Sequence, residues 1–223
     1  MRGSQATAGA TTPCEAPPTP LNTEITGSRR FAAQSYSLDR LRQIGKATGA
    51  TVNDLTLAIC AAALRRHLLS RGALRRTDLT AMVPVSLHGH DNAGDECGNQ
   101  VALLLANLAS QIADPLKRLK RILASTTAAK RQLSKMSRLQ KIAHGAAMQA
   151  FAGVRLLTGQ ARERPAFNLM ICNVPGPRET LYLDGARLDE VYPLSIPSHY
   201  LARNITITIT ITITITITIT ISG

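Results

Sequence analysis

The chain has 223 residues, enough for one large domain or two small ones with a real hydrophobic core. Hydrophobic residues make up 44% and aromatic residues 3%, with no tryptophan, so the chain is typical of a globular protein and not of a base-stacking platform for single-stranded nucleic acid. Lysine and arginine number 26 against 14 acids, a net charge of +12, which favours anionic partners.

The cysteines and the N-terminal segment indicate a cellular location. Cys14, Cys60, Cys97 and Cys172 lie far apart and form no C-x-x-C pair, which excludes a zinc knuckle and favours a reducing compartment. No run of about 18 apolar residues occurs, and the N-terminus has no apolar segment of the kind found in secretory signals. We therefore predict a cytoplasmic protein without a signal peptide or a transmembrane helix.

The first predicted elements follow a segment of low complexity. Residues 1–20 are rich in Ala, Thr, Gly and Pro, which predicts a disordered arm or linker. Phe31–Tyr36 predicts a short strand. Ser37 then offers an N-cap for a helix with apolar residues at helical spacing, which ends between Gly45 and Gly49.

A second, stronger helix is predicted to begin at Thr51 and to end near Gly72. Thr51 caps it, and Asp54 lies three residues later, where a carboxylate meets free backbone N–H groups. The helix is apolar on nearly all sides up to Arg65, which predicts a buried position. This helix start is sufficient to explain Asn53 and Asp54, and a role beside a catalytic group is the alternative.

Two strands with a loop between them are predicted next. Leu79–Leu87 is the first, and its Pro84 requires an edge, a bulge or a strand end, because proline has no N–H. Val101–Leu105 is the second, apolar throughout and therefore predicted to be buried on both faces. No metal site is predicted in the loop, because no second cluster supports its ligand-type side chains. Those side chains are His88, His90, Asp91, Asp95 and Cys97.

A long helical region is predicted from Asp114–Pro115 towards Leu157, with a break near Gly145. Nine Lys or Arg and no acid lie between Lys117 and Lys141, so this element carries most of the net charge. The basic helix, residues 115–145, is either a packed amphipathic helix with a solvated face or a surface for an anionic membrane or for nucleotide phosphates. Nucleic acid is a weaker alternative, because no aromatic residues are interleaved with the cations. The cations that lead it are Lys117, Arg118, Lys120 and Arg121.

Phe167–Cys172 predicts a further strand, and the stiff Asn-Val-Pro-Gly-Pro segment that follows predicts a turn. This turn is either a plain connection or the wall of a substrate channel. The wall residues would be Asn173, Pro175, Gly176 and Pro177. Asp184–Gly185 between two short apolar segments then predicts a β-hairpin.

From Ile205 to Ile221 the sequence alternates Ile and Thr without interruption. As a single strand, this tract would span roughly 56 Å, beyond ordinary strands of 3–10 residues. We hypothesise that residues 205–223 are an aberrant low-complexity tail, produced by slippage in a repetitive stretch of the gene in place of the true C-terminus.

Taken in order, these motifs resemble the bacterial wax ester synthase/acyl-CoA:diacylglycerol acyltransferase family. The resemblance covers about residues 18–206. The matching residues are Pro20-Leu21-Asn22, Gly27-Ser28-Arg29-Arg30-Phe31, Thr51-Val52-Asn53-Asp54, Val83-Pro84-Val85-Ser86-Leu87, Gly98-Asn99, Asp114-Pro115 with Arg118-Leu119, Asn173-Val174-Pro175-Gly176-Pro177, Leu181-Tyr182-Leu183-Asp184-Gly185-Ala186, Tyr192-Pro193-Leu194-Ser195 and Asn204-Ile205-Thr206.

The resemblance implies an α/β fold: the C-terminal half of a two-domain, chloramphenicol-acetyltransferase-like fold of CoA-dependent acyltransferases, with a mixed sheet flanked by helices. Residues 21–204 would form this domain, between an arm at 1–20 and a tail at 205–223. The implied reaction moves a fatty acyl group from acyl-CoA, a co-substrate and not a bound cofactor, to diacylglycerol or a fatty alcohol. It also implies peripheral contact with membranes or lipid inclusions. The residue patterns themselves predict neither a metal nor a nucleic acid as partner.

One departure from the family bears on activity. The family's catalytic motif is His-His-x-x-x-Asp-Gly, whose second His takes the hydroxyl proton of the acceptor, and this sequence does not contain it. We therefore expect the chain to hold no catalytic residue, to be inactive alone and to need a separate N-terminal catalytic domain. The resemblance assigns Asn53 and Asp54 as active-site supports. The rival interpretation is a non-catalytic module that binds anionic lipid or a partner through the basic helix.

Overall fold

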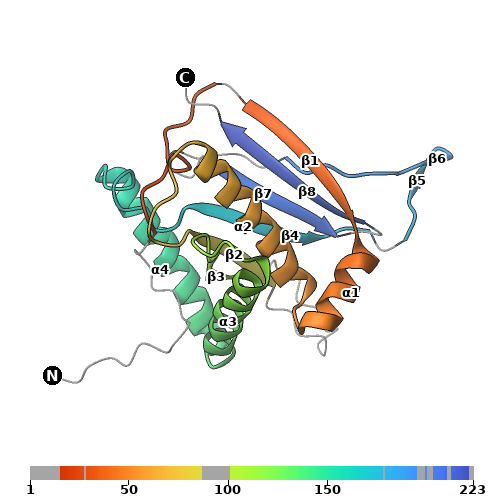
Figure 1. Cartoon of the computed structure of the whole chain (residues 1–223), viewed down its shortest axis with the longest axis horizontal. Helices are drawn as coiled ribbons and strands as arrows, with labels where there is room; N and C mark the ends of the chain where they lie inside the picture. The colour runs from red at the N-terminus through yellow and green to blue at the C-terminus, as the bar shows by residue number, and fades with distance from the viewer. Residues whose placement is uncertain are drawn as a thin grey trace.

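The computed structural model describes residues 16–27, 29–86, 101–177, 179–194, 199, 203–209 and 212–220. Within them the chain forms a six-stranded sheet, a separate two-stranded hairpin and flanking helices (Figure 1). The strands of the large sheet are β1 (Arg29–Ser37), β2 (Thr80–Ser86), β3 (Val101–Asn107), β4 (Leu169–Pro175), β7 (Arg203–Ile209) and β8 (Thr212–Thr220). The hairpin is β5 (Tyr182–Leu183) with β6 (Ala186–Arg187), and the helices are α1 (Leu38–Thr48), α2 (Val52–Ser70), α3 (Pro115–Ser134) and α4 (Arg138–Leu157).

The large sheet is mixed, as predicted. Its strands lie in the order β1-β8-β7-β4-β2-β3. β4 runs parallel to β2 on one side and to β7 on the other, while the remaining neighbours are antiparallel. The carboxyl ends of β2, β4 and β7 therefore meet at one edge of the sheet, which is the ordinary place for a ligand site in open α/β sheets.

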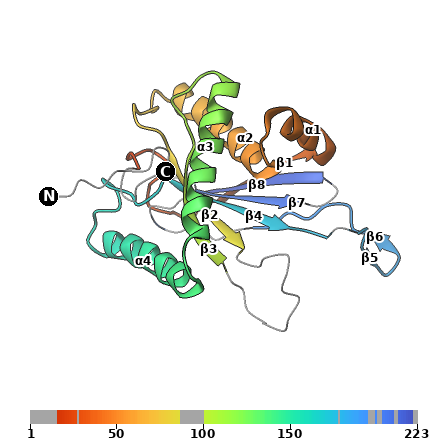
Figure 2. The same cartoon turned by 90° about the horizontal axis from the view of Figure 1, so that it is seen from below.

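Helices cover the sheet unequally on its two faces. Seen almost edge-on, α1 and α2 lie above the sheet and α4 lies below it (Figure 2). Alternate strand residues such as Val83, Leu104 and Ile171 join the core under α1, α2 and α3. Met82 and Leu103 point the other way and pack with Phe167 and side chains of α4. Thus β3 is buried on both faces, as its apolar sequence predicts.

The predicted starts of α1 and α2 are confirmed. The Ser37 hydroxyl accepts a hydrogen bond from the backbone N–H of Arg40. Thr51 and Asp54 form a reciprocal capping box at the start of α2. α1 ends at Gly49, whose φ of 71° is a left-handed conformation that glycine adopts without strain.

The long basic region is two helices, and the predicted break near Gly145 is wrong. α3 ends at Ser134, and Ser137 begins α4 through a capping box with Gln140. The Ser137 hydroxyl accepts from the N–H of Gln140, and the Gln140 side chain accepts from the N–H of Ser137. These bonds satisfy the free N–H groups of a new helix, whereas Gly145 lies inside α4.

Pro84 lies within β2 but at a place where the strand has one neighbour. β2 pairs with β3 along its whole length, and its pairing with β4 stops at Met82. Beyond Met82, β2 is locally an edge, so the missing N–H of Pro84 removes no bond between β2 and β4.

The Ile-Thr tract is part of the sheet, which corrects the prediction that it lies outside the domain. It folds back on itself as β7 and β8 instead of forming a single strand of 17 residues. β7 pairs in parallel with β4, and β8 pairs antiparallel with β1. Ile205, Ile207 and Ile215 are buried under the helices, so the alternation supplies one apolar face to the core.

Two other predicted boundaries are corrected. β4 continues through Asn173 to Pro175, because β7 extends its ladder, so these residues are strand and not turn. At the N-terminus, Ala16 and Thr19 are buried, and the carbonyl of Pro17 accepts from the Asn168 side chain. Residues 16–20 are therefore packed on the domain and do not belong to a disordered arm. The predicted metal-type residues at 88–97, the glycine and asparagine at 98–99, and residues 1–15 lie outside the described residues.

The β5–β6 hairpin is confirmed. Asp184 and Gly185 have φ of 49° and 78°, which suits the primed turn that the Asp-Gly pair predicts. The hairpin projects from the sheet with all four strand residues exposed (Figure 1).

Candidate active site

Asp54 is held by three hydrogen-bonding groups at the start of α2. It is 1% exposed. One carboxylate oxygen accepts from the N–H and the hydroxyl of Thr51, at 3.0 and 2.5 Å. The other accepts from the Thr126 hydroxyl of α3, at 2.7 Å. A carboxylate engaged in this way braces α2 against α3, and both of its oxygens accept hydrogen bonds within the chain. Its role as an active-site support stays a prediction.

Asn53 and Asn173 meet at the carboxyl edge of the parallel strands. The amide nitrogen of Asn173, near the end of β4, donates to the side-chain oxygen of Asn53 at 3.3 Å. The side-chain oxygen of Asn173 is buried and accepts no hydrogen bond from the described residues. The structure therefore joins two residues that lie 120 positions apart and leaves an acceptor there for a further donor.

The segment after Asn173 is fixed by the strand beside it. Pro175 is paired with Ile209 in the parallel ladder, and the N–H of Gly176 donates to the carbonyl of Ile209 at 2.8 Å. Gly176 and Pro177 are half-buried. This backbone is stiff enough for a wall, and its use as a channel wall stays a prediction.

The four leading cations of α3 do not form one surface group. Lys117, Lys120 and Arg121 are exposed, whereas Arg118 is 6% exposed. Its guanidinium donates to the carbonyls of Ile112 and Ala113, at 2.9 and 3.3 Å. Burial, and then the nearby positive charge of Arg65, lower the pKa of Arg118. Arg118 thus holds the turn before α3, and its head is engaged within the chain.

The two described cysteines are poor nucleophiles. Burial raises the pKa of Cys60 in α2 to about 12, and burial also raises the pKa of Cys172 in β4. Since the thiolate is the reactive form, neither residue supports covalent catalysis near neutral pH. Among the described residues no group of three or more His, Cys, Asp or Glu is arranged to hold a metal ion.

An apolar cavity of about 220 Å³ lies at α4, on the other face of the sheet from Asn53. Its lining comes from α4, from the segment that leads into β4, and from His199. Neither Asn53 nor Asn173 contributes to it. The cavity is therefore separate from the asparagine pair.

Thr126 is the residue of this site that the sequence interpretation missed. It lies in the middle of α3, where no capping or turn pattern marks it, and it contacts Asp54 only because α2 and α3 pack side by side. The buried hydroxyl is 1% exposed and accounts for the second oxygen of Asp54.

Comparison with known proteins gives the family. Residues 97–222 match the WS/DGAT C-terminal domain, and residues 1–56 match the wax ester synthase/diacylglycerol acyltransferase catalytic domain. The first match alone covers more than half of the 223 residues. The chain belongs to the wax ester synthase/diacylglycerol acyltransferase family.

Relatives with curated names agree with this assignment. An O-acyltransferase WSD of Acinetobacter baylyi is 44% identical over 86% of this chain and 42% of its own length. A putative diacylglycerol O-acyltransferase of Mycobacterium tuberculosis is 43% identical over 86% of this chain and 39% of its own length. The chain thus spans less than half the length of these two relatives.

Solved structures agree on the fold. A wax ester synthase/diacylglycerol acyltransferase from Marinobacter aquaeolei VT8 superposes with a TM-score of 0.80 at 39% identity, over 92% of this chain and 46% of that one. The starter condensation domain of rhizomide synthetase superposes with a TM-score of 0.54 at 12% identity, over 93% of this chain and 43% of that one, and shows a shared fold alone. The predicted α/β acyltransferase-like fold is confirmed.

The two family matches meet in one sheet. β1 belongs to the catalytic-domain match and pairs with β8 of the C-terminal match. The hydrogen bond between Asn53 and Asn173 also joins the two matches, because Asn53 belongs to the catalytic-domain match and Asn173 to the C-terminal match. The C-terminal match also runs through the Ile-Thr tract, to residue 222.

Among the described residues, no single helix is long and apolar enough to cross a membrane. α1 and α2 pass such a test by length and composition as a pair, but they are bent by 100° at the break between them.

Proposed function

We propose that this chain is one domain of an O-acyltransferase that uses acyl-CoA as co-substrate and a diacylglycerol or a fatty alcohol as acceptor. The supporting observation is the Asn53–Asn173 contact, which joins the two family matches at the carboxyl edge of the parallel strands. Sites in open α/β sheets gather at this edge.

In the proposed reaction the acceptor hydroxyl oxygen attacks the thioester carbonyl while a histidine takes the hydroxyl proton. The C–S bond then breaks, the CoA sulfur leaves and is protonated, and an ester forms. The histidine motif His-His-x-x-x-Asp-Gly does not occur in these 223 residues. We therefore propose that these 223 residues are inactive alone and that a domain carrying this motif supplies the base.

The residues of this chain have positioning roles in this proposal. Asp54 holds the start of α2 against α3 through Thr51 and Thr126, which keeps Asn53 in place. Asn53 in turn accepts a hydrogen bond from the amide nitrogen of Asn173, and no described residue donates to the Asn173 oxygen. In this proposal that oxygen accepts from a donor group on the substrate or on the domain that carries the histidine motif.

Labelled palmitoyl-CoA with dioleoylglycerol or hexadecanol tests the proposal. The purified chain should give no ester, and the chain mixed with a family polypeptide that contains the histidine motif should give one. Asn173→Asp, which keeps the size of the side chain but removes its donor, should lower kcat at least about tenfold in the mixture. Ester synthesis by the chain alone would show that the base lies within it.

A second proposed function is a non-catalytic module that contacts anionic lipid or a partner through residues 115–145. Its support is the run of nine cations without an acid between Lys117 and Lys141, of which eight are exposed or partly exposed and Arg118 is buried. It predicts salt-sensitive binding to anionic vesicles. Charge reversal at Lys117, Lys120 and Arg121 should weaken that binding, and unchanged binding would refute a role for the start of α3. Peripheral association with a lipid surface is part of this proposal, and the cytoplasmic location stays a prediction.

A further inference from the structure

β2 and β4 are neighbours in the sheet but are paired over a short stretch. Among the described residues, their parallel pairing ends at Met82 with Met170. β2 nevertheless continues over residues 83–86 and β4 over residues 171–175. These two segments are named the open β2–β4 stretch. Figure 2 shows the two strands diverging towards their carboxyl ends, so two strand edges face each other there without a ladder between them.

Proline at position 84 accounts for the end of the pairing. The carbonyl of Thr80 accepts from the backbone N–H of Asn168, and the N–H of Thr80 donates to the Asn168 side chain, so both groups point to the β4 side. Every second residue of a strand repeats this direction, which brings Met82, Pro84 and Ser86 to the same side. Since proline has no N–H, β2 cannot donate the bond that would extend the ladder beyond Met82.

The interruption leaves backbone hydrogen-bonding groups without a strand partner. On β2 they are the carbonyl of Pro84 and the N–H and carbonyl of Ser86, with which no described strand pairs on this side. In its part of the stretch, β4 has β7 on one side and no described strand on the other. Such groups cost free energy when they are shielded from water without a partner. The stretch is therefore suited to an extended ligand with N–H and carbonyl groups of its own.

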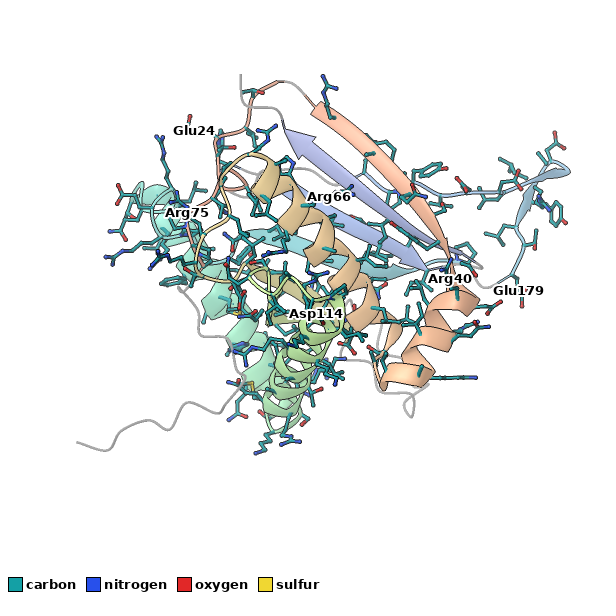
Figure 3. All side chains as sticks on the ribbon, in the orientation of Figure 1. Glu24, Arg40, Arg66, Arg75, Asp114 and Glu179 are labelled. Atoms are coloured by element: carbon teal, nitrogen blue, oxygen red, sulfur yellow. The ribbon has the colours of Figure 1, made fainter. Side chains whose placement is uncertain are left out.

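The asparagine pair lies at this stretch. Asn173 belongs to it, and its amide nitrogen donates to Asn53, while its buried side-chain oxygen accepts no bond from the described residues. A ligand N–H there has this oxygen as an acceptor in addition to the strand carbonyls. Arg40 and Glu179 are exposed and lie beyond the ends of β4 and β7 (Figure 3), so solvent reaches this edge of the sheet.

We propose that the open β2–β4 stretch binds the pantetheine arm of acyl-CoA as an extended chain between the two strands. The arm is a narrow chain with amide groups that ends in the sulfur of the thioester. Its N–H groups donate to strand carbonyls and to the Asn173 oxygen, and its carbonyls accept from strand N–H groups, in the manner of an added strand. The fatty acyl chain has no such donors, and the phosphates of the nucleotide end are too costly to bury within a sheet. This inference rests on the proposed function for the identity of the co-substrate.

Hydrogen–deuterium exchange locates the arm directly. CoA added to the parent chain should slow exchange at least about tenfold in peptides that cover residues 83–86 and 171–174, and should leave the exposed β5–β6 hairpin unchanged. Protection confined to other segments would overturn the proposal. Protection of the stretch by a polypeptide that carries the histidine motif, and not by CoA, would show instead that a strand of that domain is the occupant.

Pro84→Val supplies the missing N–H and should let the ladder close. This variant should bind CoA at least about tenfold more weakly than the parent in equilibrium dialysis, because β4 then takes the bonds that the arm would make. The urea midpoint of unfolding should equal that of the parent or exceed it, since a ladder bond is gained and valine favours strands. The matched control is Pro115→Ala at the first position of α3, which should bind CoA as the parent does. Equal affinity of the parent and Pro84→Val would contradict the proposal.

Changes in the ligand test the same contact without any change in the chain. An acetyl-CoA analogue with an ester in place of the amide next to the sulfur lacks an N–H donor, and it should bind about tenfold more weakly than acetyl-CoA. Phosphoadenosine phosphate, the nucleotide end of CoA without the arm, should leave exchange in the open β2–β4 stretch unchanged. If it protects the stretch as CoA does, the nucleotide and not the arm is the occupant.

These measurements separate this inference from the proposed function, because exchange and dialysis need no ester. If the mixture with the histidine-motif polypeptide forms ester but CoA does not protect the open β2–β4 stretch, the proposed function stands and this inference fails. If CoA protects the stretch and no mixture forms ester, the inference stands as a CoA site and the proposed reaction fails.

Discussion

α2 and α4 are of almost equal length, 19 and 20 residues, and lie on opposite faces of the same sheet. Eight residues of α2 are buried, among them Leu57 and Leu68, which are 0% exposed, whereas no residue of α4 is buried. Both helices contain many apolar residues and both begin with a capping box. Composition and capping therefore explain why both segments are helical. Whether the apolar side chains are buried depends on which elements pack against each helix.

For α2 that partner is within the chain. α1 and α3 flank it, the sheet lies beneath it, and Thr126 of α3 completes the bonds of Asp54. For α4 the described residues supply a partner on one side alone, through Met148 and Ala152. A helix of this kind takes part of its stability from its capping box and its backbone, and its other side is not covered by the described residues.

Leu57→Ala should give the largest difference between the two helices. Leu57 is 0% exposed in the core, so its truncation leaves a cavity and should lower the free energy of unfolding by about 3 kcal/mol. Urea denaturation followed by circular dichroism measures it. A loss below about 1 kcal/mol would mean that α2 is packed more loosely than its burial shows.

Thr126→Val should have the next largest effect. The substitution keeps the shape of the side chain but removes the hydroxyl that donates to Asp54, which leaves a buried carboxylate oxygen without this donor. The expected loss is about 2 kcal/mol in the free energy of unfolding. Thr127→Val, at the exposed neighbouring position, is the matched control and should change stability by less than about 0.5 kcal/mol.

Cys60 should make the stability of the buried helix α2 depend on pH. The folded state raises the pKa of this thiol from 9.0 to about 12, so the folded state holds the proton more tightly than the unfolded state does. This contribution is complete below pH 9 and is lost as the pH rises from 9 towards 12. Between pH 8 and pH 10 the parent should lose about 1.4 kcal/mol more than Cys60→Ala. Equal losses in urea titrations of both proteins would contradict the buried, protonated thiol.

Leu157→Ala should have the smallest effect. Leu157 is 88% exposed in α4, so its truncation should change the free energy of unfolding by less than about 0.5 kcal/mol. The same urea titration as for Leu57→Ala measures it. A loss comparable to that of Leu57→Ala would show that the exposed side of α4 is covered within the chain.

Sequence patterns predicted correctly those parts of the fold that depend on contacts between residues close together in the chain. The capping residues Ser37 and Thr51 and the Asp184–Gly185 turn act within three or four residues, so the sequence alone predicts them. The break between Ser134 and Ser137 was missed, because glycine at position 145 is a helix breaker by propensity, whereas Ser137 starts α4 through the hydrogen bonds of a capping box. The low helix propensity of one glycine has a smaller effect than an N-cap whose hydrogen bonds are formed.

The candidate site shows the limit of such patterns. Asn53 and Asp54 are explained by the start of a helix and Asn173 by a turn, so each has an ordinary local explanation. Their meeting requires β4 to lie parallel to β2 and β7 beneath the start of α2, which is a property of the sheet order. Residues Asn173–Pro175 are likewise a strand because they pair with β7. This could not be predicted, because the uninterrupted Ile-Thr alternation does not mark where β7 ends and β8 begins.

The Ile-Thr repeat has a consequence for strand alignment. In the observed register Ile205 faces Ile217 and Thr206 faces Thr216, so like side chains lie opposite each other. Sliding β8 along β7 by two residues preserves every one of these pairings in kind and changes only the number of pairs at the ends. A slip of one residue would exchange the two faces and expose the isoleucines. The repeat thus disfavours a slip by one residue but does not distinguish between registers that differ by two residues. Loss or gain of a whole Ile-Thr unit would be absorbed at the hairpin end, whereas deletion of a single residue would turn the strand inside out.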